Sequence, residues 1–217
     1  GLGISRSDRE VSSFDLLVGS ADVETAKVMT SVPHVAIVPS TLDLLGVELT
    51  IAGSADRAFR LRDAIRKTPP MLDGQPVTYV LIDCPPSLNL LTINALVAAD
   101  AVLVPMQCEF FALEGLSQLL HTIEQIRSTL NPRLSIQGVV MTMFDQRNNL
   151  STQVLNDVRS EMGDLVYETV IPRNVRLSEA PSYGKPALLY DLKCAGSQAY
   201  LRLATEVIRR ERQLNAA

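Results

Sequence analysis

Short apolar runs alternate with longer amphipathic stretches along most of this chain. The runs have the length and composition of strands buried on both faces of a parallel sheet, and they lie at residues 35–39, 77–83, 101–106, 134–144 and 166–171. Between them apolar residues recur at helical spacing, as in residues 113–130, where Leu116, Leu120 and Ile123 share one face. This alternation predicts an α/β fold: a doubly wound, mostly parallel twisted sheet flanked by helices, with right-handed crossovers.

Capping and helix-breaking residues bound the predicted helices. Ser12 is the N-cap candidate for a helix at residues 12–17, and Gly53-Ser54 is expected to divide a long helical stretch at residues 40–67. Further helices are expected at residues 21–28, 89–99, 113–130, 151–162 and 197–213. The sequence contains no internal repeat, and we expect a single domain over residues 1–217.

The run at residues 77–83 ends abruptly in a carboxylate that is followed by two prolines. Pro85 and Pro86 cannot continue a central ladder, so Asp83 is expected to be one of the last residues of its strand. Ligands of α/β sheets bind at the carboxyl ends of strands, where a carboxylate can hold hydrated Mg²⁺, as a Walker B aspartate does. The alternative is a turn residue, or the N-cap of a helix that begins near Ser87.

Composition narrows the class of protein. A chain of 217 residues with 47% hydrophobic content can bury the core of one α/β domain. The 3 cysteines have no metal-binding spacing and argue against a disulfide framework, which favours a reducing, cytoplasmic compartment. No signal peptide is visible at Gly1, and no uncharged apolar stretch reaches the length of about 20 residues that a membrane span needs.

Charge is distributed unevenly along the chain. The net charge is −4, which for the chain as a whole argues against strong nucleic-acid binding. Residues 1–132 carry −6 and residues 133–217 carry +2. The rear part can therefore present one basic face.

Four blocks of this sequence resemble the ParA/Soj family of chromosome- and plasmid-partitioning ATPases. They are residues 81–87 (Leu-Ile-Asp-Cys-Pro-Pro-Ser), 104–115 (Val-Pro-Met-Gln-Cys-Glu-Phe-Phe-Ala-Leu-Glu-Gly), 143–147 (Met-Phe-Asp-Gln-Arg) and 171–186, which begins Ile-Pro-Arg-Asn-Val-Arg. The blocks occur in the family's order and extend over nearly the whole chain, and the last one is long and specific. The resemblance implies a P-loop NTPase-like fold.

The printed sequence departs from that family in one respect. It contains neither the deviant Walker A loop, of the type Lys-Gly-Gly-Val-Gly-Lys-Thr, nor the Asp-Pro-Gln-Gly switch segment that follows it. Residues 1–4 resemble what comes after the switch segment. We therefore expect the C-terminal four-fifths of such a protein, without the N-terminal strand and P-loop, and no ATPase activity from these residues alone. Truncation, a gene-model error and a natural deletion are all open explanations.

The resemblance implies a site for ATP or ADP with Mg²⁺. Asp83 would be the catalytic Walker B residue that holds the water shell of Mg²⁺, and Pro85 and Pro86 would shape the loop beside the γ-phosphate. The residues expected at the adenine base are Met143, Phe144, Asp145, Pro172 and Asn174. Periodicity alone favours a different role for Met143 and Phe144, which is to cap the core.

The resemblance also implies macromolecular partners. A homodimer partner would face Gln107, Glu109 and Glu114, although a solvated acidic surface explains those residues equally well. The basic residues assigned to double-stranded DNA, bound without sequence preference, are Arg147, Arg173, Arg176 and Lys185. Surface ion pairs are the alternative role for each of these four residues. A ParB-type centromere-binding partner would trigger hydrolysis, and the protein would be cytoplasmic and nucleoid-associated.

Three functions compete at this point. The first is a ParA-type partition ATPase. The second is a MinD-like cell-division ATPase that cycles on membranes, which is disfavoured because residues 209–217 offer only Leu214 as a bulky apolar residue. The third is a non-catalytic remnant that only dimerises or binds a partner. The sequence does not distinguish chromosome from plasmid origin, and it does not identify the partner.

Overall fold

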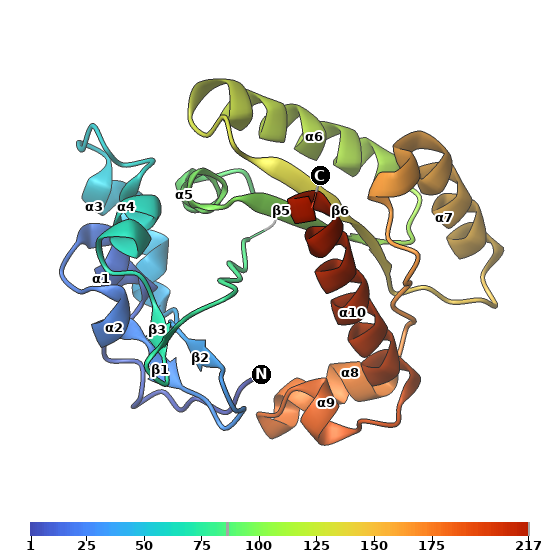
Figure 1. The fold of residues 1–217 in the computed structure, drawn as a ribbon, viewed down its shortest axis with the longest axis horizontal. Helices are drawn as coiled ribbons and strands as arrows, with labels where there is room; N and C mark the ends of the chain where they lie inside the picture. The colour runs from blue at the N-terminus through green and yellow to red at the C-terminus, as the bar shows by residue number, and fades with distance from the viewer. Residues whose placement is uncertain (86, 217) are drawn as a thin grey trace. The chain divides into compact units, whose positions relative to one another are not determined.

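The computed structural model describes residues 1–85 and 87–216, with side chains up to Gln213 (Figure 1). Its contacts group the chain into two compact units. One, called here the sheet unit, contains Ala101–Thr122 and Ser135–Ala217; the other, the helical unit, contains Leu2–Asp100 and Ile123–Leu134. The expectation of one domain over the whole chain stays a prediction.

Two parallel strands form the centre of the sheet unit. Strand β5 (Ala101–Gln107) pairs with β6 (Ser135–Thr142), from Ala101 opposite Ser135 to Gln107 opposite Thr142, with one register shift at Gln137. Helix α6 (Ala112–Thr129) follows β5 and helix α7 (Asn149–Met162) follows β6. These elements confirm the predicted α/β alternation in this part of the chain.

Residues 166–173 run parallel to β6 without forming a continuous strand. They follow the 3-10 helix η2 (Gly163–Leu165) and form two isolated bridges, one from Val166 to Val139 in β6 and one from Pro172 to Phe144, just after β6. The expected strand at 166–171 is interrupted because the N–H groups of Glu168 and Thr169 donate to the carboxylate of Glu206 instead of to a neighbouring strand.

Helices cover both faces of this small sheet (Figure 1). On one face, α6 and α7 pack against buried β-strand residues such as Val104, Val139 and Met141. On the other face, α10 (Ala195–Ala216) packs against Val140 and Tyr167. Burial on both faces explains why β6 is a nearly continuous apolar run, whereas β5 is buried on one face only and exposes Leu103 and Pro105 on the other. Between residue 173 and α10 lie three short helices, α8 (Val175–Glu179), η3 (Ala180–Tyr183) and α9 (Ala187–Tyr190).

The helical unit contains short helices and two small antiparallel strand pairs. Its helices are α1 (Ser13–Val18), α2 (Val23–Ala26), η1 (Leu42–Gly46), α3 (Val47–Ile51), α4 (Arg60–Lys67) and α5 (Leu90–Ala98). Its strands are β1 (Val28–Met29) paired with β2 (Ala36–Ile37), and β3 (Met71–Leu72) paired with β4 (Gln75–Pro76). The predicted N-cap at Ser12 is confirmed, with a capping box to Asp15, and the helical stretch is divided at Gly53-Ser54 as expected.

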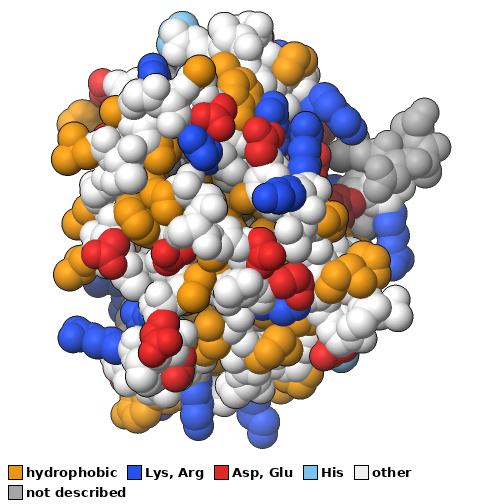
Figure 2. All heavy atoms as spheres, turned by 90° about the vertical axis from the view of Figure 1, so that its left-hand side faces the viewer, with side chains coloured by type: hydrophobic (Ala, Val, Ile, Leu, Met, Phe, Trp, Pro, Cys, Tyr) orange, Lys and Arg blue, Asp and Glu red, His pale blue; other side chains and the backbone are white. Residues whose placement is uncertain are grey.

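The strand predicted at residues 77–83 is wrong for this structure. None of these residues belongs to a strand, and Leu81 is 90% exposed. An apolar run becomes a strand only when a neighbouring strand completes its backbone hydrogen bonds, and within the described residues no strand pairs with this run. Figure 2 shows hydrophobic side chains at the surface, scattered among acidic and basic ones.

Candidate functional site

At the carboxyl end of β6, hydrogen bonds hold together the two loops whose residues were assigned to the adenine base. Met143, the first residue after the strand, has a positive φ of 55°. The N–H of Phe144 donates to the carbonyl of Ile171 (3.1 Å), and the N–H of Arg173 donates to the carbonyl of Phe144 (2.9 Å). Residues 143–147 and 172–176 are therefore held side by side in the sheet unit.

The side chains at this junction are apolar and differ in exposure. Met143 is exposed, while Phe144 and Pro172 are half-buried, with Phe144 packed on the core that α6 and α7 cover. A non-glycine residue at positive φ costs about 1 kcal/mol or more, and such residues cluster at ligand-binding loops. Apolar surface with nearby backbone polar groups is what a purine needs.

Asp145 and Arg147 form a closely bonded pair in the loop after β6. The Arg147 Nε–H donates to Asp145 Oδ1 at 3.0 Å, and its Nη2–H donates to Oδ2 at 2.8 Å. The backbone N–H of Arg147 also donates to Oδ1 at 3.0 Å. The Arg147 side chain and its N–H thus lower the pKa of Asp145 to about 2, with a smaller contribution from the charge of Arg173. The pair remains ionised at neutral pH.

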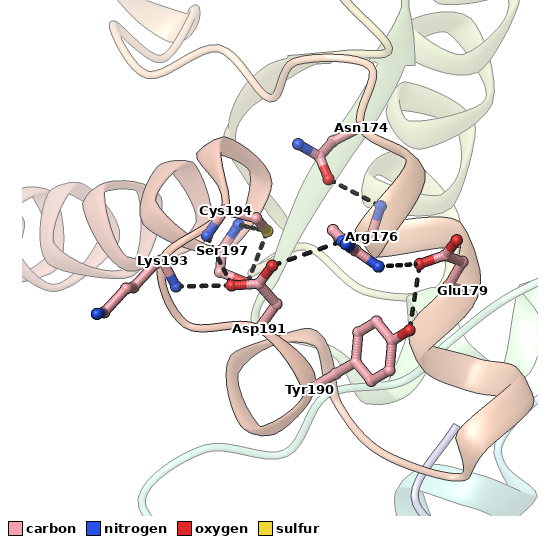
Figure 3. Close-up of polar contacts among 8 residues, drawn as sticks. All are labelled: Asn174, Arg176, Glu179, Tyr190, Asp191, Lys193, Cys194 and Ser197. Atoms are coloured by element: carbon pink, nitrogen blue, oxygen red, sulfur yellow. Dashed lines mark hydrogen bonds and ion pairs between the residues drawn. The ribbon is translucent and has the colours of Figure 1, made fainter.

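Arg176 lies between two carboxylates (Figure 3). Its Nη1–H donates to Glu179 Oε2 at 2.9 Å, and its Nε lies 3.6 Å from Asp191 Oδ2. The Tyr190 hydroxyl also donates to Glu179 Oε2, at 3.2 Å, which links α8 to α9. The contact with Glu179 raises the pKa of Arg176. Arg176 therefore already has ionic partners within its own segment.

The remaining assigned residues of this region differ in their surroundings. Asn174 is the N-cap of α8, and its Oδ1 accepts from the Arg176 N–H at 2.9 Å. Arg173 and Lys185 are exposed, and within the described part of the chain neither forms a salt bridge. Both side chains can reach an anion in solvent, and the charge of Arg173 also acts on Asp145.

Asp83 and Pro85 belong to the helical unit and are both exposed. Pro86 lies outside the described residues. No group of three or more possible metal ligands occurs among the residues that the structure describes. A single exposed carboxylate nevertheless fits Mg²⁺, because this ion keeps several waters and is usually bound by one or two carboxylates plus phosphates.

Gln107, Glu109 and Glu114 lie at the carboxyl end of β5 and the start of α6, and all three are exposed. Between them stand Phe110 and Phe111, which are 75% and 70% exposed and pack edge to face with ring centroids 5.1 Å apart. Neither phenylalanine was among the residues for which the sequence predicted a role. The available signal was the pair of adjacent aromatic residues between Glu109 and Ala112, in a chain with only 5 phenylalanines.

Sequence comparison now identifies the family. A family model described as an AAA domain matches residues 1–136. The chromosome partitioning protein ParA of Caulobacter vibrioides is 61% identical over 216 residues, which cover 100% of this chain and 80% of that protein. The chain belongs to the ParA/Soj family.

Solved structures agree with the fold of this ParA/Soj family member. Cobyrinic acid a,c-diamide synthase from Mycobacterium smegmatis, with bound ADP and magnesium, has a TM-score of 0.78 and 33% identity, covering 97% of this chain and 76% of that one. The cell division ATPase MinD of Pyrococcus furiosus has a TM-score of 0.74 and 25% identity, covering 96% and 79%. ADP and magnesium are ligands that the sequence resemblance implied here.

The printed sequence contains no glycine-rich loop with a following lysine, which is what cradles the phosphates in P-loop proteins. In the part of the chain that the structure describes, no helix has the length and apolar character of a membrane span.

Proposed function

We propose that this chain acts as a partition ATPase that binds ATP with Mg²⁺, forms a homodimer, and binds double-stranded DNA without sequence preference. A ParB-type centromere-binding partner would stimulate hydrolysis and release the DNA. The observation that carries the proposal is the junction of residues 143–147 with residues 172–176, because it joins the loop proposed to hold the base to a loop with basic side chains.

Each part of the junction has a distinct role in this proposal. Met143, Phe144 and Pro172 would hold the base through apolar contact, and Asn174 would fix the start of α8 beside it. Asp145, whose carboxylate oxygens are both bound to Arg147, would contribute to the base site through its backbone. Asp83 would hold the water shell of Mg²⁺, and the ion would supply charge neutralisation for phosphoryl transfer.

The ATPase proposal is tested by hydrolysis measurements on two polypeptides. The 217-residue chain alone should show no turnover above background, because it contains no phosphate-binding loop. If the reading frame continues upstream of the Gly1 codon into a Lys-Gly-Gly-Val-Gly-Lys-Thr-like loop, the longer protein should hydrolyse ATP slowly in the presence of DNA and partner. Asp83→Ala should abolish the Mg²⁺-dependent turnover, whereas Asp43→Ala, at another exposed carboxylate of the helical unit, should not. Unchanged turnover in Asp83→Ala would refute the metal role.

DNA binding is tested by the salt dependence of the affinity for a duplex of arbitrary sequence. Removal of one phosphate contact lowers the slope of log K against log salt by about 0.9. Arg173→Ala and Lys185→Ala should each weaken binding in this way, and Arg176→Glu should weaken it as well. Arg212→Ala, at an exposed position late in α10, is the matched control and should leave the slope unchanged. Equal slopes for all variants would place the DNA surface elsewhere.

A non-catalytic dimerisation or partner-binding module is the second candidate. The exposed Phe110–Phe111 pair favours it. A stop codon directly upstream of Gly1 would support this function over the ATPase. In both functions the surface formed by Gln107, Glu109, Phe110, Phe111 and Glu114 would face a second copy. Replacing both phenylalanines by Ala should weaken self-association in sedimentation experiments at least tenfold, because aromatic residues dominate such interfaces (an effect of about 1.4 kcal/mol or more).

A further inference from the structure

The Asp145–Arg147 pair leaves one edge of the arginine free. A guanidinium has five N–H donors, and Asp145 takes two of them, the Nε–H and one Nη2–H. One Nη1–H and the second Nη2–H form the outer, end-on edge, and the other Nη1–H points to the third side. The Arg147 side chain is 88% exposed, so this edge is in solvent. One guanidinium can therefore bind the carboxylate on its inner edge and a phosphate on its outer edge.

The carboxylate itself is held by rigid elements on both sides. The residue before it, Phe144, is hydrogen-bonded to Ile171 and Arg173. On the other side, the Asp145 carbonyl accepts from the Asn148 N–H at 3.0 Å, and Asn148 is the N-cap of α7. The Asp145 side chain is only 23% exposed. The strand end and the helix start thus fix the position from which Asp145 directs Arg147.

We propose that Asp145 is a positioning residue for DNA binding, which holds the Arg147 side chain so that its outer edge meets a backbone phosphate. This inference rests on the proposed function. An arginine side chain has about 2 kcal/mol of rotamer entropy, and a side chain that is already ordered loses less of it on binding. Asp145 therefore favours DNA binding although it carries a negative charge.

Simple electrostatics predicts the opposite change in DNA affinity, so a measured Kd distinguishes the two roles of Asp145. Asp145→Asn makes the DNA-facing surface more positive, so a purely repulsive role for Asp145 requires tighter binding in the variant. A positioning role requires Kd to rise by about three- to tenfold, the usual cost of ordering one such side chain. Asp157→Asn, at an exposed site on α7, makes the same charge change and should leave Kd equal or slightly lower.

The experiment uses the protein expressed from its whole reading frame, saturated with a non-hydrolysable ATP analogue and Mg²⁺, and a 30-base-pair duplex as the probe. Saturation removes any contribution from altered nucleotide affinity, which is measured separately. The same Asp145→Asn substitution is then made in an Arg147→Lys background. Lysine has no second edge to orient, so there the substitution should no longer weaken binding.

A readout without DNA reports on the pair directly. The Arg147 Nε–H signal in a nitrogen-15 NMR spectrum should be distinct in the parent and lost or averaged in Asp145→Asn. An unchanged signal would overturn the proposal, as would tighter DNA binding by Asp145→Asn or an equal loss in the Arg147→Lys background. The last two outcomes leave the proposed function standing. If the parent itself does not bind the duplex, the proposed function fails and this inference fails with it.

Discussion

Residues 101–107 and 77–83 are both short runs of apolar, β-forming residues, yet only the first forms a strand. Strand β5 lies in parallel register with β6, and its residues Val104 and Met106 are buried under helices. The second run has no strand pairing within the described residues, and Leu81 at its centre is almost fully exposed. The difference shows that strand formation here depends on the neighbouring strand and not on local composition.

The same comparison explains where the candidate site is well defined. The loops at the carboxyl end of β6 are fixed by the bridge between Phe144 and Pro172 and by the start of α7. Asp83, in contrast, ends a run that forms no strand in the structure described here, and it is exposed in an irregular segment. The hydrogen-bonded backbone after β6 therefore positions Arg147 and the residues assigned to the adenine base, whereas no strand pairing holds the segment around Asp83 among the residues described.

The largest expected effect tests how closely β6 is packed. Gly138 has a φ of 155°, and a Cβ at this position would lie 2.6 Å from the Tyr167 ring and 2.7 Å from the Leu165 carbonyl oxygen. Gly138→Ala should lower the free energy of unfolding by about 3 kcal/mol, measured by urea denaturation. Gly115→Ala, in α6 with open space around it, should instead be neutral or stabilise by about 0.5 kcal/mol. Equal effects would show that β6 is not tightly enclosed.

The next effect concerns the interrupted segment beside β6. Glu206 is 6% exposed, and its carboxylate accepts from the N–H groups of Glu168 (2.8 Å) and Thr169 (3.0 Å) and from Arg210 (2.9 Å). Glu206→Gln removes the charge and leaves one of these donors without an acceptor, so we expect a loss of about 2 kcal/mol in stability. Thr205→Val, at the exposed neighbouring position of α10, should change stability by less than about 0.5 kcal/mol.

The same carboxylate predicts a pH dependence. Burial of Glu206 opposes its ionisation, but the N–H groups of Glu168 and Thr169 and the charge of Arg210 outweigh it, so the pKa lies below the ordinary 4.5. A lowered folded-state pKa contributes stability above pH 4.5 that is lost as pH falls through the folded value. As the pH falls from about 5 to about 3, the parent should therefore lose more stability than the Glu206→Gln variant. Parallel pH profiles would contradict this role.

The smallest expected effect is that of Leu81→Ala, which is compared here with Val104→Ala in β5. Val104→Ala removes buried methyl groups from β5 and should cost about 2 kcal/mol. Leu81→Ala removes a larger side chain, from the run at residues 77–83. It should nevertheless change the stability of the 217-residue chain by less than about 0.5 kcal/mol, because the Leu81 side chain is already in solvent. A cost for Leu81→Ala similar to that for Val104→Ala would mean that residues 77–83 are buried in solution.

Much of the local structure followed from periodicity and capping residues. The Ser12 cap, the break at Gly53-Ser54 and the helices starting after Asn89 and ending at Met162 are all confirmed. Resemblance to known blocks selected residues 143–147 and 172–176, and the structure joins them. The contacts within the candidate site could not be predicted from periodicity, capping residues or resemblance. No rule of spacing indicates that Asp145 holds Arg147, that Glu206 reaches the backbone of Glu168, or that Phe110 and Phe111 are exposed together.

The sequence by itself determined the family, most of the helices with their caps, and the types of side chain proposed for base, metal and phosphate. Helices and caps are settled by residues within one or two turns of each other, so local patterns suffice for them. Tertiary structure alone decided which apolar runs pair, how the loops after β6 meet, and how Arg176 is held between Glu179 and Asp191. Strand pairing and the contact of Arg176 with Asp191 depend on residues farther apart in the chain, and they contribute stability only once those residues are brought together.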